Sequence, residues 1–179
     1  MSFKKLYLEN TIGVFKNYKT LAENSFLQLS SDKDFYYMLD SESNSIAVII
    51  KHLSGNMISR WTDFLTTDGE KPTRNRDAEF VDDNLTNEEL LQIWHKGWNV
   101  FLNTLCSLNE TDLLKDITIR GEKLTVTQAI NRQMAHYAYH IGQIVLLAKH
   151  IKSREWKSLS IPKNRSEQYS KGPYLDNIK

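Results

Sequence analysis

The chain has 179 residues, of which 40% are hydrophobic and 25% charged, a balance typical of one globular domain with a sizeable core. The formal net charge is +1, so no overall field favours nucleic acid or an anionic membrane, and no apolar run approaches the roughly 20 residues of a membrane helix. A single cysteine, Cys106, and an N-terminus without the apolar core of a secretory signal favour a cytoplasmic protein.

Four segments repeat apolar residues every three or four positions, which is the period of an amphipathic α-helix. The third segment begins with the capping box Thr86-Asn87-Glu88-Glu89 and the fourth with Thr125-Val126-Thr127-Gln128. Four amphipathic helices bury their apolar faces most simply against one another, so we predict an all-α fold, a four-helix bundle. The expected helices lie near residues 3–29, 44–66, 86–106 and 126–151.

The connections between these helices differ in length. Residues 67–85 are rich in charge and longer than adjacent antiparallel helices need, so we expect a crossover that runs along the bundle between the second and third helices. Residues 117–124 contain two isoleucines and a Gly-Glu turn, and they predict a short hairpin.

The helical period stops after Ile151. We expect residues 1–152 to form the bundle and residues 153–179 to form an extended C-terminal segment that packs on it or on a second subunit. The large side chains that favour packing over a free tail are Trp156, Leu159, Ile161, Tyr169 and Tyr174.

The segment QMAHYAYHIGQIV in the fourth predicted helix carries the strongest chemical signal. His136 and His140 are four residues apart, so their imidazoles lie on one helical face and can converge on a metal ion. Two histidines in an apolar stripe need partners for their ring nitrogens, and the alternative is a core-edge pair satisfied by tyrosines or backbone. No charged residue interrupts that stripe, which comprises Ala129, Gln133, His136, His140, Ile144 and Leu147.

A third ligand must come from another helix, and His52 in the second helix is the first candidate. Alone it is better explained as a core-edge histidine, but with the H-x3-H pair it completes a three-histidine site with an open position. Asn56, one turn on, is a candidate to support the ligands. His95 is the next candidate ligand, whereas His150 near a helix C-terminus is explained by the helix dipole.

Other chemistries lack their motifs. The fourth helix has no acidic residue between Glu122 and Glu155, which excludes the Glu-x-x-His pairs of a ferritin-like di-iron site. The sequence has no H-E-x-x-H, G-x-S-x-G, P-loop or dinucleotide glycine motif. It has no basic stripe with interleaved aromatic residues, so we expect no nucleic-acid partner.

These residues together resemble the DinB-like superfamily of bacterial metal-binding four-helix bundles. Its pattern is a histidine followed by an apolar residue in the second helix, matched by His52-Leu53, and H-x3-H late in the fourth, matched by His136 to His140. The segment RWTDFLTTDGEKPTRNRDAEF, Arg60 to Phe80, is similar to one of an uncharacterised subgroup of domain-of-unknown-function proteins. The resemblance covers nearly the whole chain.

The resemblance implies a bundle with a crossover between helices two and three, one divalent transition metal such as zinc or nickel, and often a homodimer. It implies no single reaction, because characterised members include bacillithiol- and mycothiol-dependent transferases and isomerases, and many members have no known activity. We therefore expect a small-molecule ligand or thiol as the partner, and we do not expect binding to a membrane.

Two classes of function remain open. The first is a metal-dependent S-transferase that joins a low-molecular-weight thiol to small electrophiles, since a coordinated thiol becomes a strong nucleophile. The second is a non-catalytic metal or small-ligand binding module linked to the stress response. Turnover of a thiol with an electrophile separates them.

Arg74 and Arg76, in the long loop, are candidates to clamp the carboxylates of such a thiol. The simpler interpretation, which we favour, is a solvated charged loop in which acidic neighbours pair with both arginines. Those neighbours are Asp68, Glu70, Asp77 and Glu79.

Overall fold

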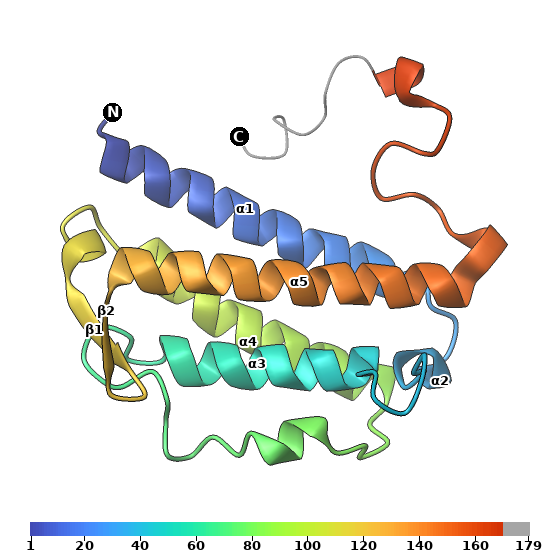
Figure 1. Cartoon of the computed structure of the whole chain (residues 1–179), viewed down its shortest axis with the longest axis horizontal. Coiled ribbons are helices and arrows are strands. Elements are labelled where there is room, and N and C mark those ends of the chain that lie inside the picture. The colour runs from blue at the N-terminus through green and yellow to red at the C-terminus, as the bar shows by residue number, and fades with distance from the viewer. Residues whose placement is uncertain (170–179) are drawn as a thin grey trace.

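In a computed structural model, which describes residues 1–169, the chain is a bundle of four long helices (Figure 1). The all-α prediction is therefore confirmed. A short helix, α2 (Asp32–Phe35), lies in the first connection, a detail that the polar sequence there did not predict. The long helices are α1 (Phe3–Phe26), α3 (Ile46–Trp61), α4 (Asn87–Ser107) and α5 (Val126–Lys152).

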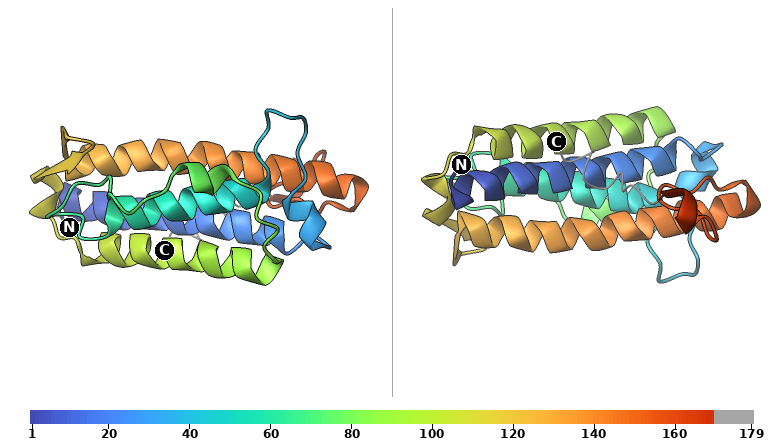
Figure 2. Two further views of the ribbon diagram at one scale, coloured as in Figure 1. Left: turned by 90° about the horizontal axis from the view of Figure 1, so that it is seen from below. Right: turned by 90° about the horizontal axis from the view of Figure 1, so that it is seen from above.

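The long connection after α3 is a consequence of helix direction. Figures 1 and 2 show that α3 and α4 run the same way, so residues 62–86 must return along the outside of α3 before α4 begins. A helix of 16 residues is about 24 Å long at 1.5 Å per residue, which explains the length of the crossover. The only regular element within residues 62–86 is a 3-10 turn, η1 (Asp77–Phe80), which packs against α3.

Aromatic side chains from all four long helices form the centre of the core. Phe15, Trp61, Trp98, Phe101 and Tyr137 are all fully buried, and the Phe15 and Phe101 rings meet edge to face with centroids 4.5 Å apart. These residues lie on apolar stripes that periodicity indicates, and close packing of this kind is what fixes the relative position of the helices. Both capping boxes predicted for the third and fourth helices are present.

Two helices end earlier than expected, α1 at Phe26 and α3 at Trp61. Leu29 extended the first apolar stripe, and it packs half-buried against the core from beyond the end of the helix. Phe64 extended the second stripe and is buried, yet it reaches the core from a turn after the helix, where its ring packs on Trp61 at 4.3 Å between centroids. The helical spacing of apolar residues therefore predicts that this residue is buried, but it does not predict that the residue lies within the helix.

The predicted hairpin is confirmed. Strands β1 (Asp116–Ile119) and β2 (Glu122–Thr125) pair antiparallel, with Ile117 opposite Leu124, and lie at the end of the bundle where α5 begins (Figure 1).

The C-terminal segment contacts the bundle near its start. After the 3-10 turn η3 (Ser153–Glu155), Trp156 is half-buried against the core. The side chain of Gln28 donates to the carbonyl of Lys157 and accepts from its N–H group. Leu159 is half-buried, whereas Ile161 is 47% exposed, and η4 (Ser166–Tyr169) follows. The side chain of Tyr169 and all of Tyr174 lie outside what the structure describes. No helix within residues 1–169 has the length and apolar character to cross a membrane.

Candidate metal centre

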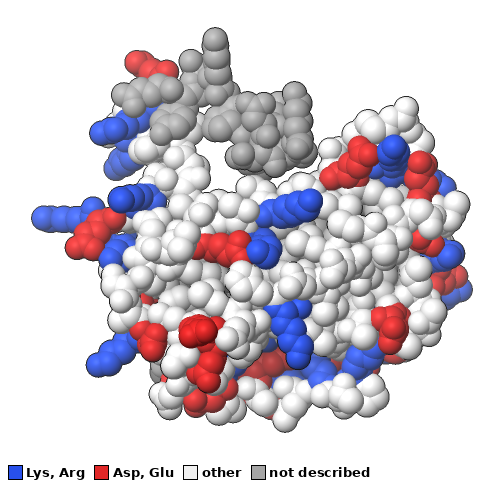
Figure 3. All heavy atoms as spheres, turned by 180° about the vertical axis from the view of Figure 1, so that it is seen from behind, with Lys and Arg blue, Asp and Glu red and all other residues white. Residues whose placement is uncertain are grey.

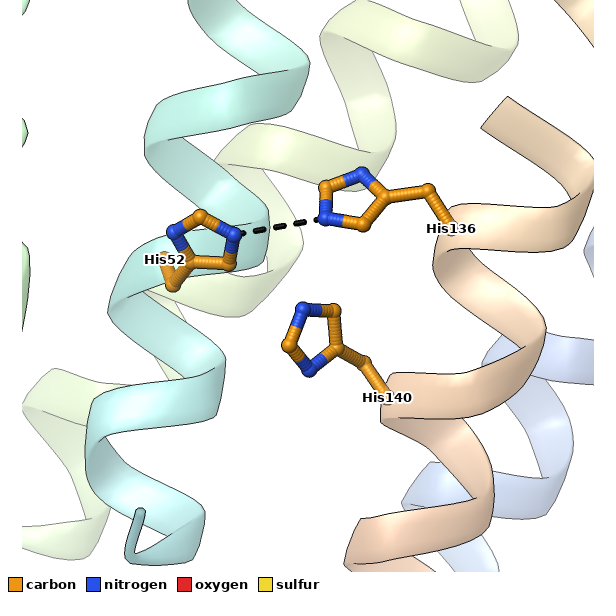
Figure 4. A group of neighbouring side chains, drawn as sticks. All are labelled: His52, His136 and His140. Carbon is orange, nitrogen blue, oxygen red and sulfur yellow. Dashed lines mark hydrogen bonds between the residues drawn. The ribbon is translucent and has the colours of Figure 1, made fainter. Parts of the chain in front are cut away.

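Helices α3 and α5 bring His52, His136 and His140 together in the space between them (Figure 4). One ring nitrogen from each histidine lies within 4.8 Å of the other two, and the Nε2 atoms of His52 and His136 are 3.3 Å apart. Figure 4 shows the three rings turned toward one shared point, with His136 and His140 one turn apart on α5.

The spacing of these nitrogens fits a transition-metal ion. Two imidazole nitrogens at the usual 2.0–2.1 Å from a tetrahedral ion are about 3.3–3.4 Å from each other. The observed 3.3 Å between His52 and His136 agrees with this value and is longer than a typical nitrogen hydrogen bond of about 2.9–3.0 Å. Three imidazoles are a donor set that suits zinc, nickel, copper or iron.

Burial keeps two of the three rings neutral, which is the form that binds a metal. Burial, together with the neighbouring His140 and His52, lowers the pKa of His136 to about 3. Burial lowers the pKa of His140 to about 4, against the opposing effect of its hydrogen bond to Gln143. At neutral pH neither ring must lose a proton before it coordinates.

The ring of His52 is oriented by Glu79, a residue that our sequence analysis did not assign to the site. The Nδ1 atom of His52 donates to Glu79 Oε2 at 2.9 Å, so the lone pair of Nε2 faces the other two histidines. Arg74 donates from Nε and Nη2 to the two oxygens of Glu79, at 2.7 and 2.8 Å. Burial raises the pKa of Glu79, but the hydrogen bonds from His52 and Arg74 outweigh it and hold the carboxyl ionised.

A glycine lets this carboxylate approach α3. A Cβ atom at Gly55 would lie 2.2 Å from Glu79 Oε1, so any larger residue would displace the carboxylate that supports His52. This glycine, three residues after His52 within a helix, is the one sequence feature that could have indicated a close approach to the site. On the other helix, Gln143 Oε1 accepts from Nδ1 of His140 at 3.0 Å and orients that ring in the same way.

The other predicted residues lie elsewhere or act differently. No hydrogen bond joins Asn56 to the three histidines; its Oδ1 accepts from Gln133 at 2.6 Å and from Tyr137 at 3.3 Å. His95 is exposed, 3.5 Å from Glu23. His150 stacks on Tyr37 near the far end of α5.

The acidic partners expected for Arg74 are confirmed, since Glu79 at 2.7 Å and Glu70 at 3.6 Å pair with it, but its expected exposure to solvent is wrong. The Arg74 side chain is only 4% exposed, because the 3-10 turn folds the crossover against α3 and buries the Arg74–Glu79 ion pair there. Arg76 is exposed, and its guanidinium lies 5.0 Å from the centre of the Phe80 ring. Both arginines line an open pocket of about 410 Å³ whose wall includes His52 and His136.

Comparison with known protein families gives a match over most of the chain. The model of a family described as "Protein of unknown function (DUF1572)" matches residues 2–165. No curated protein and no solved structure matches the chain. Because the match covers nearly the whole chain, the chain belongs to the DUF1572 family, an uncharacterised family.

Proposed function

We propose that this chain binds one divalent transition metal, zinc or nickel, through His52, His136 and His140, and that it is a thiol S-transferase acting on small electrophiles. The observation that carries the proposal is the convergence of three imidazole nitrogens from α3 and α5, two of them on rings oriented through Nδ1. The resemblance to the DinB-like superfamily supports the metal, and the thiol-dependent transferases among its characterised members suggest the reaction, which the resemblance alone does not fix.

An open coordination position favours catalysis over a purely structural role. Within residues 1–169 no fourth histidine, cysteine, aspartate or glutamate joins the group. Structural zinc sites have four protein ligands, whereas catalytic sites have three and leave a position for water or substrate. Two of the ligands, His52 and His136, also line the open pocket, so a small molecule can reach them from solvent.

The chain's own residues prepare this position. Glu79 fixes the tautomer of His52 and, as an anion, makes the Nε2 atom of His52 a stronger electron-pair donor to a metal ion. Arg74 holds Glu79 in this position. Gln143 does the same for His140 without adding charge. A bound divalent ion would supply a Lewis acid that lowers the pKa of a thiol at neutral pH.

Elemental analysis of the purified protein, followed by a thiol-consumption assay, tests the proposal. We expect about one metal equivalent per chain, and metal-dependent loss of bacillithiol, mycothiol or glutathione in the presence of an electrophile such as monochlorobimane. In this substitution the thiol loses its proton to solvent, its sulfur forms a bond to carbon, and chloride departs with the electron pair of the broken C–Cl bond. Protein that takes up no metal after incubation with zinc and nickel contradicts the metal site. Stoichiometric metal without turnover of any thiol contradicts the transferase and favours the non-catalytic binding module.

The same resemblance supports a homodimer, and the single cysteine, Cys106, fits the reducing cytoplasm. Light scattering of the metal-loaded protein tests the dimer, and a mass equal to one chain at micromolar concentration would count against it.

A further inference from the structure

The pocket beside the candidate metal centre is unusually rich in arginine. Five guanidinium groups line it, together with His52 and His136, and no carboxylate is among the lining residues. The five come from the end of α3, the crossover, the hairpin turn and α5: Arg60, Arg74, Arg76, Arg120 and Arg132.

Two of these arginines are buried and already neutralised. Arg60, 5% exposed, donates from Nη1 to Glu70 at 2.9 Å and to the carbonyl of Gly69 at 3.1 Å. Arg74, 4% exposed, is held by Glu79 through two hydrogen bonds. These two ion pairs form a fixed inner wall and leave little capacity for a ligand.

The other three arginines have N–H groups that are not used in ion pairs and can donate to a ligand. Arg120 is 55% exposed and uses only its Nε atom on Glu70, and Arg132 is 46% exposed with Glu122 no closer than 3.8 Å. Arg76 has no carboxylate within 4.0 Å among residues 1–169. Three carboxylates, those of Glu70, Glu79 and Glu122, pair with the five guanidinium groups, so the arginines outnumber their ion-pair partners by two.

Backbone hydrogen bonds hold the hairpin turn against the crossover and so position Arg120. The two carboxylate oxygens of Asp68 accept from the backbone N–H groups of Arg120 and Gly121, each at 2.9 Å, and Gly69 N donates to Thr118 O at 2.7 Å. The pocket wall is thus built from two connections that are joined to each other and not from free loops.

Helix α5 presents Arg132 to the same pocket as the histidines. Arg132 is four residues before His136 and eight before His140, so all three lie along one face of the helix. The Cα atom of Arg132 therefore lies about 6 Å along the helix axis from that of His136, and both side chains line the pocket.

We infer that this pocket binds a small organic anion with two or more negative charges, carried by carboxylate or phosphate groups. The anionic end contacts Arg76, Arg120 and Arg132, and the remainder of the molecule is directed toward His52 and His136. Arginine suits such groups because its planar fork donates two parallel hydrogen bonds to their oxygens. The inference rests on the proposed function in one respect, because it assigns the substrate class of that same site.

A small molecule fits the pocket better than a polymer does. Its volume of about 410 Å³ falls within the roughly 300–1,000 Å³ of small-molecule sites. On the face of the molecule in Figure 3, by contrast, basic and acidic side chains are interspersed, as on an ordinary solvated surface. The positive charge is concentrated in a concave site beside the histidines.

Calorimetric titration of the full chain with pyrophosphate and with citrate, each in the metal-free and the metal-loaded state, tests the inference. We expect binding that weakens as salt is added, and glycerol should not bind. Tighter binding of pyrophosphate indicates a phosphate ligand and tighter binding of citrate a polycarboxylate, and either supports the inference.

Arg120→Gln and Arg132→Gln should each weaken anion binding to the metal-free chain by roughly tenfold or more, because each removes a charged hydrogen-bond donor. The control is Arg154→Gln, an exposed arginine outside the pocket, which should bind as the wild type does. All three residues are exposed, so their replacement should leave the fold intact. Equal affinity of the two pocket variants and the control would overturn the inference.

The metal content of the same samples separates this inference from the proposed function. A chain that binds anions through these arginines but takes up no metal retains the anion site and contradicts the metal centre. A chain that loads one metal but binds neither pyrophosphate nor citrate contradicts the anion site alone.

Discussion

Two of the three candidate ligands in this bundle, His52 and His140, each have a second side chain that orients the ring. Glu79 is the clearest case, and we predict that Glu79→Gln lowers metal affinity by about 10–100-fold, the usual effect of losing a residue that supports a ligand. The reason is that an amide retains the size of the carboxylate but not the charge that fixes His52 and pairs with Arg74. Competition with a metal chelator measures the affinity.

Asp77→Asn is the matched control for this variant, because Asp77 is exposed in the same 3-10 turn and makes no contact with the histidines. It should bind metal as tightly as the wild type. Equal affinities of the Glu79→Gln and Asp77→Asn variants would show that Glu79 has no part in holding the site.

The histidines also predict how stability depends on pH in the metal-free protein. In the unfolded chain both His136 and His140 titrate near 6.5, whereas burial lowers their folded-state pKa values to about 3 and about 4. Well above pH 6.5 both rings are neutral in the folded and in the unfolded state, so they contribute no pH dependence there. As pH falls from 6.5 toward 4, the unfolded chain binds protons that the folded chain does not, so the free energy of unfolding decreases.

Urea denaturation at pH 7.5, 6.0 and 5.0 measures this dependence. The His136→Ala/His140→Ala double variant should lose less stability than the wild type over the same interval. A wild-type protein whose loss of stability matches that of the double variant would contradict the assigned burial of the two rings.

Sequence spacing was sufficient to select the H-x3-H pair, because residues four apart on a helix necessarily share a face. Selecting His52 also needed the family resemblance, since nothing local distinguishes it from a core-edge histidine. Glu79 was not predicted because it reaches the site from an irregular turn, 27 residues further along the chain, whose path no periodicity specifies. The local sign of its approach, Gly55, is recognisable only once the turn is seen to pack on it.

At the scale of elements, the contact between α3 and α4 depends on a glycine. A Cβ atom at Gly97 would lie 2.7 Å from the Cα of Ser54. Because this is a backbone atom, it can move away only if α3 itself moves. We predict that Gly97→Ala lowers the free energy of unfolding by about 1–3 kcal/mol, the usual cost of overpacking. Thermal or urea denaturation followed by circular dichroism measures it.

Gly142→Ala is the control, since Gly142 lies within α5 and a Cβ there has nothing within 4 Å. This variant should be as stable as the wild type or more stable by up to about 1 kcal/mol, because alanine favours helix. A Gly97→Ala protein that gains stability in the same way would mean that α3 and α4 pack less closely than described.

The elements themselves were largely predictable. Apolar stripes and the capping boxes at Thr86 and Thr125 located the long helices, and the isoleucines with a Gly-Glu turn located the hairpin. Errors fell at helix ends, where Leu29 and Phe64 pack against the core from beyond the last turn of the helix. Helix ends are set by tertiary contacts that a period of 3.6 residues does not contain.

For the molecule as a whole, the C-terminal segment is expected to add stability where it contacts the bundle. Trp156 is half-buried against the core, so we predict that Trp156→Ala lowers the free energy of unfolding by about 1–3 kcal/mol, less than for a fully buried tryptophan. Ile161→Ala is the comparison, because Ile161 is 47% exposed and should change stability little in the monomer. Denaturation curves of equal midpoint for Trp156→Ala and wild type would contradict packing of the segment.

The charge distribution is the feature of the whole molecule that the sequence concealed. A net charge of +1 gave no sign of a basic site, because the five pocket arginines are distributed between residues 60 and 132 and acidic residues elsewhere balance them. Their convergence follows from the crossover and the hairpin, whose mutual contacts through Asp68 are non-local.

Metal affinity of single alanine variants tests the central claim most directly. His52→Ala, His136→Ala and His140→Ala should each lose more affinity than the roughly 10–100-fold expected for a supporting residue, because each removes one of three ligands. His95→Ala and His150→Ala, which lie outside the site, should match the wild type. The bundle should stay folded in all five, since its apolar core does not include the histidines. Full metal occupancy of His52→Ala at low free metal would contradict the three-histidine site.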